Sequence, residues 1–197
     1  MITKNEQHHL SRCLESVRGL VDETIIVDTG STDRTVEIGR CYGAQVLDFR
    51  WRDDFSAARN HGLDAATGDW ILVIDADESI AERDHQRIRA WLRREGVDAV
   101  NASQRHYLPS GVVVGWQAGA GGYEEGEPYP GFVDVSCRRL FRNRPWLRFR
   151  NRVHEELVSN DPRRPLVQAS GDWVIHHFGK AGGADVLELG EIGRAHV

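Results

Sequence analysis

The fold of this chain is decided by residues 70–79, which read Trp-Ile-Leu-Val-Ile-Asp-Ala-Asp-Glu-Ser. The apolar run at 70–74 has the length of a buried strand, and two carboxylates one residue apart follow it. Side chains alternate along an extended chain, so Asp75 and Asp77 can point the same way beyond the strand end. Two hard oxygen ligands suit a divalent cation, which can in turn hold a diphosphate. An isolated Asp-x-Asp more commonly only solubilises a strand end, so the surrounding sequence has to decide.

Helices and strands alternate on both sides of this stretch, as judged from apolar periodicity, capping residues and β-branched runs. In chain order we expect a helix with apolar positions 10, 13, 14 and 17, a strand at 24–27, a helix at 33–42, a strand at 46–49, a helix at 54–68, the strand at 70–74 and a helix burying Ile88, Trp91 and Leu92. This alternation predicts an α/β fold with a mainly parallel sheet flanked by helices. Such sheets bind ligands beyond the carboxyl ends of their strands.

The pattern changes after residue 97. We expect strands at 99–107, 112–116 and 133–142, which gives the second half a mixed or antiparallel sheet. Between them, residues 118–131 contain five glycines and two prolines, so we expect a loop there, either a mobile substrate loop or a connector. The chain is thus predicted to be one domain over 1–190, with a nucleotide-binding half at 1–97 and an acceptor half at 98–190.

The composition fits a globular domain. Of the 197 residues, 40% are hydrophobic and 28% charged, which is ordinary for a soluble protein. A net charge of −5 creates no field that favours nucleic acid, so no nucleic-acid partner is expected. There is no apolar segment near the ~20 residues of a membrane span and no signal-peptide pattern. We therefore expect a cytoplasmic protein, with peripheral association at the inner face of a membrane left open.

Both ends of the sequence look interrupted. Residues 1–3 resemble the last residues of a first strand, so upstream strand residues are expected to be missing. Residues 191–197 read Glu-Ile-Gly-Arg-Ala-His-Val, which a common short-read sequencing adapter encodes when translated in frame. We therefore expect a non-native tail at 191–197 and a natural chain interrupted near Gly190.

Two further segments carry candidate binding residues. Residues 25–35 read as a strand with Asp28 at its tip, a Gly-Ser turn and a helix start. Asp28 could accept hydrogen bonds from a uracil or a ribose hydroxyl, and Gly30 would let the backbone approach the ligand; alternatively, Asp28 only caps the turn. Arg59, on the third expected helix, could point back toward a nucleotide or its phosphates, or could be a surface arginine.

Several motifs together resemble a known family. They are Asn5-Glu6, Val-Asp-Thr-Gly-Ser-Thr-Asp-Arg-Thr (27–35), Asp-Phe-Ser-Ala-Ala-Arg-Asn (54–60), Ala-Thr-Gly-Asp-Trp-Ile-Leu (66–72) and Asp-Ala-Asp-Glu (75–78). Their order and spacing resemble family 2 glycosyltransferases with the GT-A fold. Arg-Leu-Phe-Arg-Asn (139–143), Val-His-Glu (153–155) and His-His-Phe-Gly (176–179) are similar to the branch of lipopolysaccharide-core glucosyltransferases and glycosyltransferases with tetratricopeptide repeats. Thr29 replaces the second Asp of the usual Val-Asp-Asp-Gly-Ser turn, and we assign the nucleotide contact to Asp28.

The resemblance implies an inverting transfer of a sugar from a nucleotide-sugar, here expected to be a UDP-sugar. The acceptor would be a hydroxyl of a glycan, a lipid-linked glycan or a peptide, as in cell-envelope glycan biosynthesis. Mn or Mg would be the cofactor. The implied nucleotide-binding residues are Glu6, Asp28, Gly30, Arg59 and Asp75, and the implied metal ligands are Asp75, Asp77 and His177.

Two catalytic residues follow from the same resemblance. Glu155 is expected to take the proton from the acceptor hydroxyl, with His154 sharing or orienting that task; alternatively, Glu155 is only a polar surface residue. Because neighbours on a strand face opposite sides, at most one of His176 and His177 is expected to bind the metal, and we assign His177 with His176 as the alternative.

Two other functions stay open from the sequence alone. Residues 71–79 also fit the first motif of haloacid-dehalogenase-type phosphatases, with Asp75 as nucleophile and Asp77 as acid. That motif normally opens its fold, whereas two strands and three helices are expected before it here. A nucleotide-sugar binding module without turnover is the second alternative.

Overall fold

The computed structural model describes residues 1–108 and 113–179. The helices are α1 (Leu10–Ser16), α2 (Thr35–Cys41), α3 (Phe55–Ala65) and α4 (His85–Leu92), with 3-10 turns at Glu82–Asp84 and Glu124–Gly126. The strands are β1 (Ile2–Thr3), β2 (Ile25–Asp28), β3 (Gln45–Asp48), β4 (Trp70–Leu72), β5 (Glu78–Ile80), β6 (Ala99–Leu108), β7 (Gln117–Ala118), β8 (Gly131–Arg142), β9 (Leu147–Arg150), β10 (Glu156–Ser159) and β11 (Gln168–His177). The expected tail at 191–197 lies outside the described residues.

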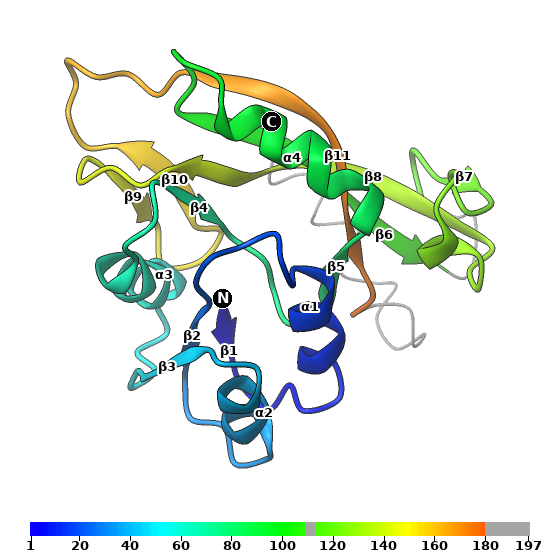
Figure 1. The fold of residues 1–197 in the computed structure, drawn as a ribbon, viewed down its shortest axis with the longest axis horizontal. Coiled ribbons are helices and arrows are strands. Elements are labelled where there is room, and N and C mark those ends of the chain that lie inside the picture. The colour runs from blue at the N-terminus through cyan, green and yellow to red at the C-terminus, as the bar shows by residue number, and fades with distance from the viewer. Residues whose placement is uncertain (109–112, 180–197) are drawn as a thin grey trace.

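A parallel sheet forms the N-terminal part of the molecule, in the order β1-β2-β3. Side chains alternate along β2, so Ile26 packs among Leu10 and Leu14 of α1, while Val27 packs on the other face with Ala58 of α3. Both faces of the sheet are therefore covered by helices, as the sequence predicted. Figure 1 shows these strands below the long strands of the second sheet.

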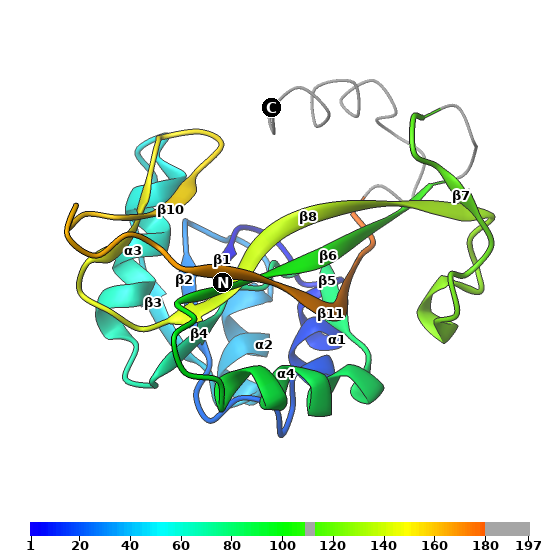
Figure 2. The ribbon, with the colours of Figure 1, turned by 90° about the horizontal axis from the view of Figure 1, so that it is seen from above.

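The second sheet has six strands in the order β4-β8-β6-β11-β5, with β7 paired to β8. Its pairs are antiparallel except for β6 with β11. Helix α4 covers one face, where Ile88 and Trp91 join a buried cluster with Trp173 of β11. Figure 2 shows α4 running along this face. The sheet of the second half of the chain contains both parallel and antiparallel pairs, which agrees with the prediction.

Two details differ from the sequence-based expectation. Strand β4 pairs antiparallel with β8, with Leu72 opposite Leu140, and thus belongs to the mixed sheet. The predicted strand at 112–116 is wrong in its described part: residues 113–116 form a turn in which the Trp116 N–H donates to the Val113 carbonyl at 3.1 Å. The reason is local, since Gly115 has a left-handed φ of 85° that an extended strand cannot accommodate.

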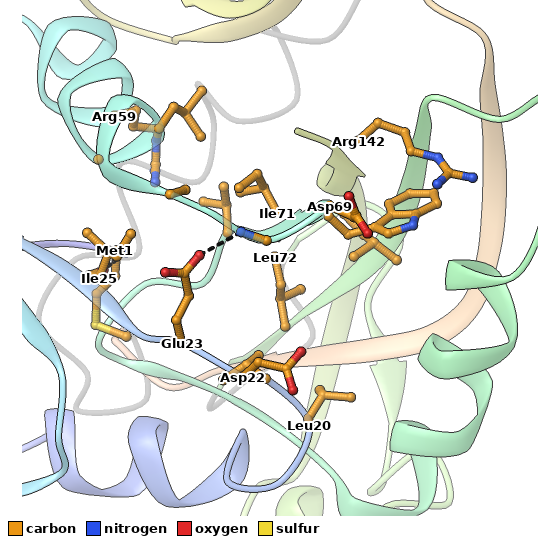
Figure 3. Close-up of a pocket in the computed structure, with 18 of the residues that line it drawn as sticks. Met1, Leu20, Asp22, Glu23, Ile25, Arg59, Asp69, Ile71, Leu72 and Arg142 are labelled. Carbon is orange, nitrogen blue, oxygen red and sulfur yellow. Dashed lines mark hydrogen bonds between the residues drawn. The ribbon is translucent and has the colours of Figure 1, made fainter. Parts of the chain in front are cut away.

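An apolar pocket of about 430 Å³ lies between the two sheets. Figure 3 shows Met1 and Ile25 on one side and Ile71 and Leu72 on the other. The pocket lining does not include residues 75–78, but it includes Arg59, which also belongs to the site described next.

The helices of the described residues are all short. Among residues 1–108 and 113–179, none is long and apolar enough to cross a lipid bilayer.

Candidate active site

The acidic turn, residues 75–78, joins β4 to β5 and is closed by hydrogen bonds between Asp75 and Glu78. The Glu78 carboxylate accepts the Asp75 N–H at 2.7 Å, and the Glu78 N–H donates to the Asp75 carbonyl at 3.0 Å. The thiol of Cys13, on α1, donates to the same carbonyl at 3.3 Å. The backbone at Asp75 is thus held from three directions, which fixes where its side chain starts.

Two largely buried arginines hold the Asp75 carboxylate. Arg139 donates to Oδ2 at 3.0 Å, and Arg59 donates to Oδ1 at 3.2 Å. Burial by itself would raise the pKa of Asp75, but the two guanidinium groups outweigh it and hold this pKa well below its usual range. Asp75 is therefore ionised, and each of its oxygens already accepts a charged hydrogen bond.

Arg59 also contacts the predicted catalytic base. It lies on α3, whose first turn is capped by Asp54 accepting the Ala57 N–H at 2.8 Å. Its Nε donates to Oε1 of Glu155 at 2.6 Å. One guanidinium therefore joins Asp75 to Glu155, and the structure brings together three residues that the sequence singled out for separate roles.

Asp77 is paired with His177 at the end of β11. The His177 Nε2 lies 3.2 Å from Oδ2 of Asp77, and the Phe178 N–H donates to the Asp77 carbonyl at 3.1 Å. Burial works to lower the pKa of His177, but the Asp77 carboxylate outweighs it and the pKa is raised. A Cβ at Gly179 would lie 2.1 Å from Oδ2 of Asp77, so only glycine leaves room for this pairing.

His176 faces the opposite side of β11. Its side chain is fully buried, and its Nδ1 lies 2.6 Å from the Tyr107 hydroxyl. Burial lowers the pKa of His176 to about 4. The structure thus places His177, and not His176, beside Asp77, as alternation along the strand predicts.

Glu155 follows a strained, exposed segment. Asn151 has a φ of 75° and His154 a φ of 55°, both left-handed. The carbonyl of Arg152 accepts the Phe55 N–H at 2.9 Å, which fastens the segment to the start of α3. The His154 side chain is exposed to solvent. It therefore lies on the solvent side of the site, although His154 directly precedes Glu155 in the sequence.

Replacing His154 by glycine should stabilise the protein. The left-handed conformation costs a non-glycine residue about 1–2 kcal/mol, and glycine avoids this cost. Part of the gain is offset, because glycine loses more conformational entropy on folding. We expect His154→Gly to raise the free energy of unfolding by up to about 1 kcal/mol, measured by urea denaturation. Val153→Gly is the matched control, since Val153 is an exposed neighbour without a left-handed φ, and should give no gain. A loss of stability in His154→Gly would contradict this account.

The Asp28 carboxylate shapes the turn that follows β2. It accepts the N–H groups of Gly30 at 3.1 Å and Ser31 at 2.9 Å, together with the hydroxyls of Ser31 and Thr3. Its acceptor sites are filled within the protein, as the capping interpretation expects. Gly30, with a φ of 103° and open space around its Cα, leaves the backbone of this turn accessible.

Glu6 lies beside the same turn. Its N–H donates to the Thr35 hydroxyl at 2.7 Å, and its carboxylate contacts His9 at 3.0 Å. Asn5 accepts the Thr32 N–H at 2.8 Å. The motifs at 5–6 and 27–35 therefore form one surface at the carboxyl ends of β1 and β2, but the Glu6 side chain turns toward α1.

Three residues of the site were missed by the sequence analysis: Glu78, Gln104 and Arg139. Glu78 and Arg139 lie inside motifs quoted for the family resemblance, which was the one available signal. Nothing local indicates that β8 brings Arg139 beside the acidic turn, because the β4–β8 pairing joins segments far apart in sequence.

Two of the three predicted metal ligands are suited to bind a divalent cation in this structure. Asp77 and His177 offer a carboxylate oxygen and an imidazole nitrogen, donors that suit Mn. The Asp75 oxygens are engaged by Arg59 and Arg139. No three Asp, Glu, His or Cys side chains converge as a ready metal site within 1–108 and 113–179. Asp77 and His177 are therefore the pair that fits the ion in this arrangement.

The parallel sheet with its Asp28 turn, joined to a mixed sheet around an Asp-x-Asp turn, defines a GT-A type of glycosyltransferase domain. Residues 1–154 match the model of the family described as Glycosyl transferase family 2, and the chain belongs to that family. This confirms the predicted fold class and enzyme class, and it contradicts the phosphatase alternative.

The similar proteins agree with this assignment. A TPR repeat-containing protein of Synechococcus elongatus is 40% identical over 188 residues, covering 91% of this chain and 41% of that protein. The SPbeta prophage-derived glycosyltransferase SunS of Bacillus subtilis is 30% identical over 168 residues, covering 84% of this chain and 36% of SunS. The chain thus spans less than half the length of these relatives. The solved structure of S. aureus TarS 1-349 shares the fold, with a TM-score of 0.51, 19% identity, and coverage of 72% of this chain and 45% of that one.

Proposed function

We propose that this domain transfers a sugar, with inversion, from a UDP-sugar to a hydroxyl of a glycan, lipid-linked glycan or peptide acceptor, in a metal-dependent reaction. The observation that carries the proposal is the acidic turn, in which Asp77 pairs with His177 and Asp75 contacts Arg59, which also donates to Glu155. The turn thus offers a carboxylate for a cation at Asp77 and contacts, through Arg59, a carboxylate for a proton at Glu155, and displacement at a sugar carbon requires both.

Each residue then has a role that follows from its contacts. Asp77 and His177 would hold Mn or Mg, which when bound supplies positive charge for the diphosphate of the leaving nucleotide. Arg59 engages Oε1 of Glu155, so we assign Oε2 as the oxygen that takes the proton of the acceptor hydroxyl. His154, exposed next to Glu155, would assist on the side from which the acceptor approaches.

The nucleotide would bind along the edge formed by Glu6, Asp28, Gly30, Arg59 and Asp75. Since the Asp28 carboxylate is occupied within its turn, we propose that it acts by shaping this surface, with the open backbone at Gly30 nearest the ligand. Asp75, supported by two arginines, would lie between the nucleotide and the cation. We further propose that the domain covers 1–190 and works in the cytoplasm, at the inner face of the membrane when its acceptor is lipid-linked.

Nucleotide-dependent stabilisation tests the proposal. We expect UDP with Mn to raise the unfolding temperature more than GDP, TDP or CMP do, because a ligand that binds only the folded state stabilises it by mass action. At a UDP concentration of about 100 times Kd the gain is about 2.7 kcal/mol, which corresponds to roughly 5–10 °C for a chain of this size. The measurement is a thermal-shift screen with Mn, Mg or chelator. No rise with any nucleotide in the presence of either metal would refute the proposal.

A further inference from the structure

We propose that Arg139, Glu78 and Gln104 form an anchor cluster, a set of partly or fully buried positioning residues that holds the acidic turn in its metal-binding arrangement. The inference rests on the proposed function for its purpose, but its geometry stands without it. None of the three residues is a candidate ligand or base. Each acts through Asp75, Asp77 or His177.

The anchor cluster is assembled from three separate strands. Glu78 begins β5 and is fully buried, Gln104 lies in β6, and Arg139 lies in β8 with its side chain 11% exposed. Gln104 donates to Oε1 of Glu78, and Arg139 donates to the same oxygen at 2.9 Å. The other oxygen, Oε2, accepts the Asp75 N–H at 2.7 Å. The Glu78 carboxylate is thus fully engaged by partners from β6, β8 and the turn.

Glu78 holds the backbone of Asp75, and Arg139 holds the side chain of Asp75. The same nitrogen, Nη2, donates to Glu78 at 2.9 Å and to Oδ2 of Asp75 at 3.0 Å. One positive group therefore lies between two carboxylates, the fully buried Glu78 and the partly exposed Asp75, that would otherwise repel each other. Arg139 is held in turn by its backbone, because its carbonyl accepts the Val73 N–H at 2.7 Å just before the turn.

The anchor cluster also reaches the other half of the proposed metal site. In the β5–β11 pairing, Glu78 stands opposite His177. Fixing Glu78 therefore fixes both the turn that carries Asp77 and the strand position that carries His177. Because the Asp77 to His177 distance depends on these two backbones, a loosened Glu78 should disturb the pairing without any change to either residue.

The charge on Arg139 is what the role requires. Removing it leaves the fully buried Glu78 carboxylate and the partly exposed Asp75 carboxylate without their shared cation. Asp75 keeps Arg59, but Glu78 keeps only uncharged donors, which is strongly unfavourable for a buried charge. The turn would then move to expose the Glu78 carboxylate to water. A lysine can substitute, since the ammonium group carries several N–H donors and one nitrogen already serves both carboxylates here.

Amide hydrogen exchange of the protein without metal or nucleotide tests the anchor directly. We expect Arg139→Met to speed exchange across the acidic turn by about tenfold or more, since local opening becomes easier. Arg139→Lys should restore protection to near the wild-type level. Arg105→Met is the matched control, because Arg105 is equally buried in β6 but pairs with Asp134 at 2.8 Å, and it should leave the turn unchanged.

Manganese binding, followed by the electron paramagnetic resonance signal of free Mn in the presence of UDP, gives the second measurement. Outer-shell changes typically weaken metal affinity about 10–100-fold, and we expect Arg139→Met to fall in that range, with Arg139→Lys recovering most of it. Should Arg139→Met fail to fold, Glu78→Gln carries the same test, because an amide cannot accept from both the Asp75 N–H and the Arg139 and Gln104 donors.

The outcomes separate the two proposals. Faster exchange at 75–78 in Arg139→Met, reversed by lysine, supports the anchor even when wild-type protein binds no Mn, a result that would overturn the proposed function alone. A folded Arg139→Met protein whose turn exchanges like the wild type overturns the anchor. So does an Arg139→Lys protein as loose as Arg139→Met, since the effect would then come from lost packing and not from the shared cation.

Discussion

Asp77→Ala is expected to abolish manganese-dependent binding of UDP, with a loss of affinity of at least about 100-fold. Losing a residue that only supports a metal ligand already weakens metal affinity by up to about 100-fold, so losing a ligand itself should cost at least as much. Asp77 is the one carboxylate of the acidic turn whose oxygen faces an imidazole, at 3.2 Å from His177, and not an arginine. Without it, the cation would have His177 as its remaining donor of the proposed pair. Titration calorimetry of UDP with and without Mn measures the change.

The matched control is Asp69→Ala, since Asp69 is an exposed aspartate that lies outside the acidic turn. Its UDP affinity should equal that of the wild type, in both the presence and the absence of Mn. Unchanged affinity of Asp77→Ala for UDP with Mn would remove the basis of the metal assignment. Equal loss in both variants would point to a general effect of charge on the fold.

Glu155→Gln should spare UDP binding and remove transfer. Loss of a general base typically lowers the rate about 10²–10⁴-fold. Glutamine keeps the shape of the side chain, and its amide oxygen can still accept the Arg59 hydrogen bond that Oε1 accepts at 2.6 Å. The variant should therefore stay folded and bind UDP with Mn within about threefold of the wild type, a difference below one kcal/mol. The measurement is release of UDP from a panel of UDP-sugars with glycan and peptide acceptors.

Glu156→Gln provides the control, because Glu156 is the next residue and its side chain is 61% exposed. It should turn over like the wild type. If the wild type and Glu155→Gln both bind UDP with Mn but are equally inactive on every acceptor, the domain is a nucleotide-sugar binding module, the remaining alternative from the sequence. If Glu155→Gln is as active as the wild type, the base is another residue.

The sequence predicted the parts of the fold that depend on local order. The periodicity of helices α1, α3 and α4 and of strand β2 lies within a few residues of sequence. Residue type limits the start of α3 to Asp53 or Asp54, and the structure has Asp54 as its cap. The partner of β4 could not be found this way. Its pairing with β8 depends on contacts between Leu72 and Leu140, and no local pattern selects β8 over the parallel strands.

The site was predictable to a similar extent. The family resemblance pointed to the motifs that hold Arg59, Asp77, Glu155 and His177. In the structure Arg59 contacts Glu155 and Asp77 contacts His177, while the roles of these residues stay predictions. The resemblance could not show that the Asp28 carboxylate accepts hydrogen bonds from its own turn, because such bonds to neighbouring N–H groups depend on the turn conformation. Nor could it show that Arg139 lies beside Asp75, since that contact exists only once β4 and β8 are paired.

Arg59 touches both Asp75 and Glu155 with a single rigid planar group. A ligand that pulls Asp75 aside would also alter the hydrogen bond that Glu155 receives from Arg59, so binding at Asp75 would change the environment of Glu155, the proposed base. Substitutions at Asp75 and Glu155 are consequently thermodynamically coupled: the effect of changing both will differ from the sum of the separate effects.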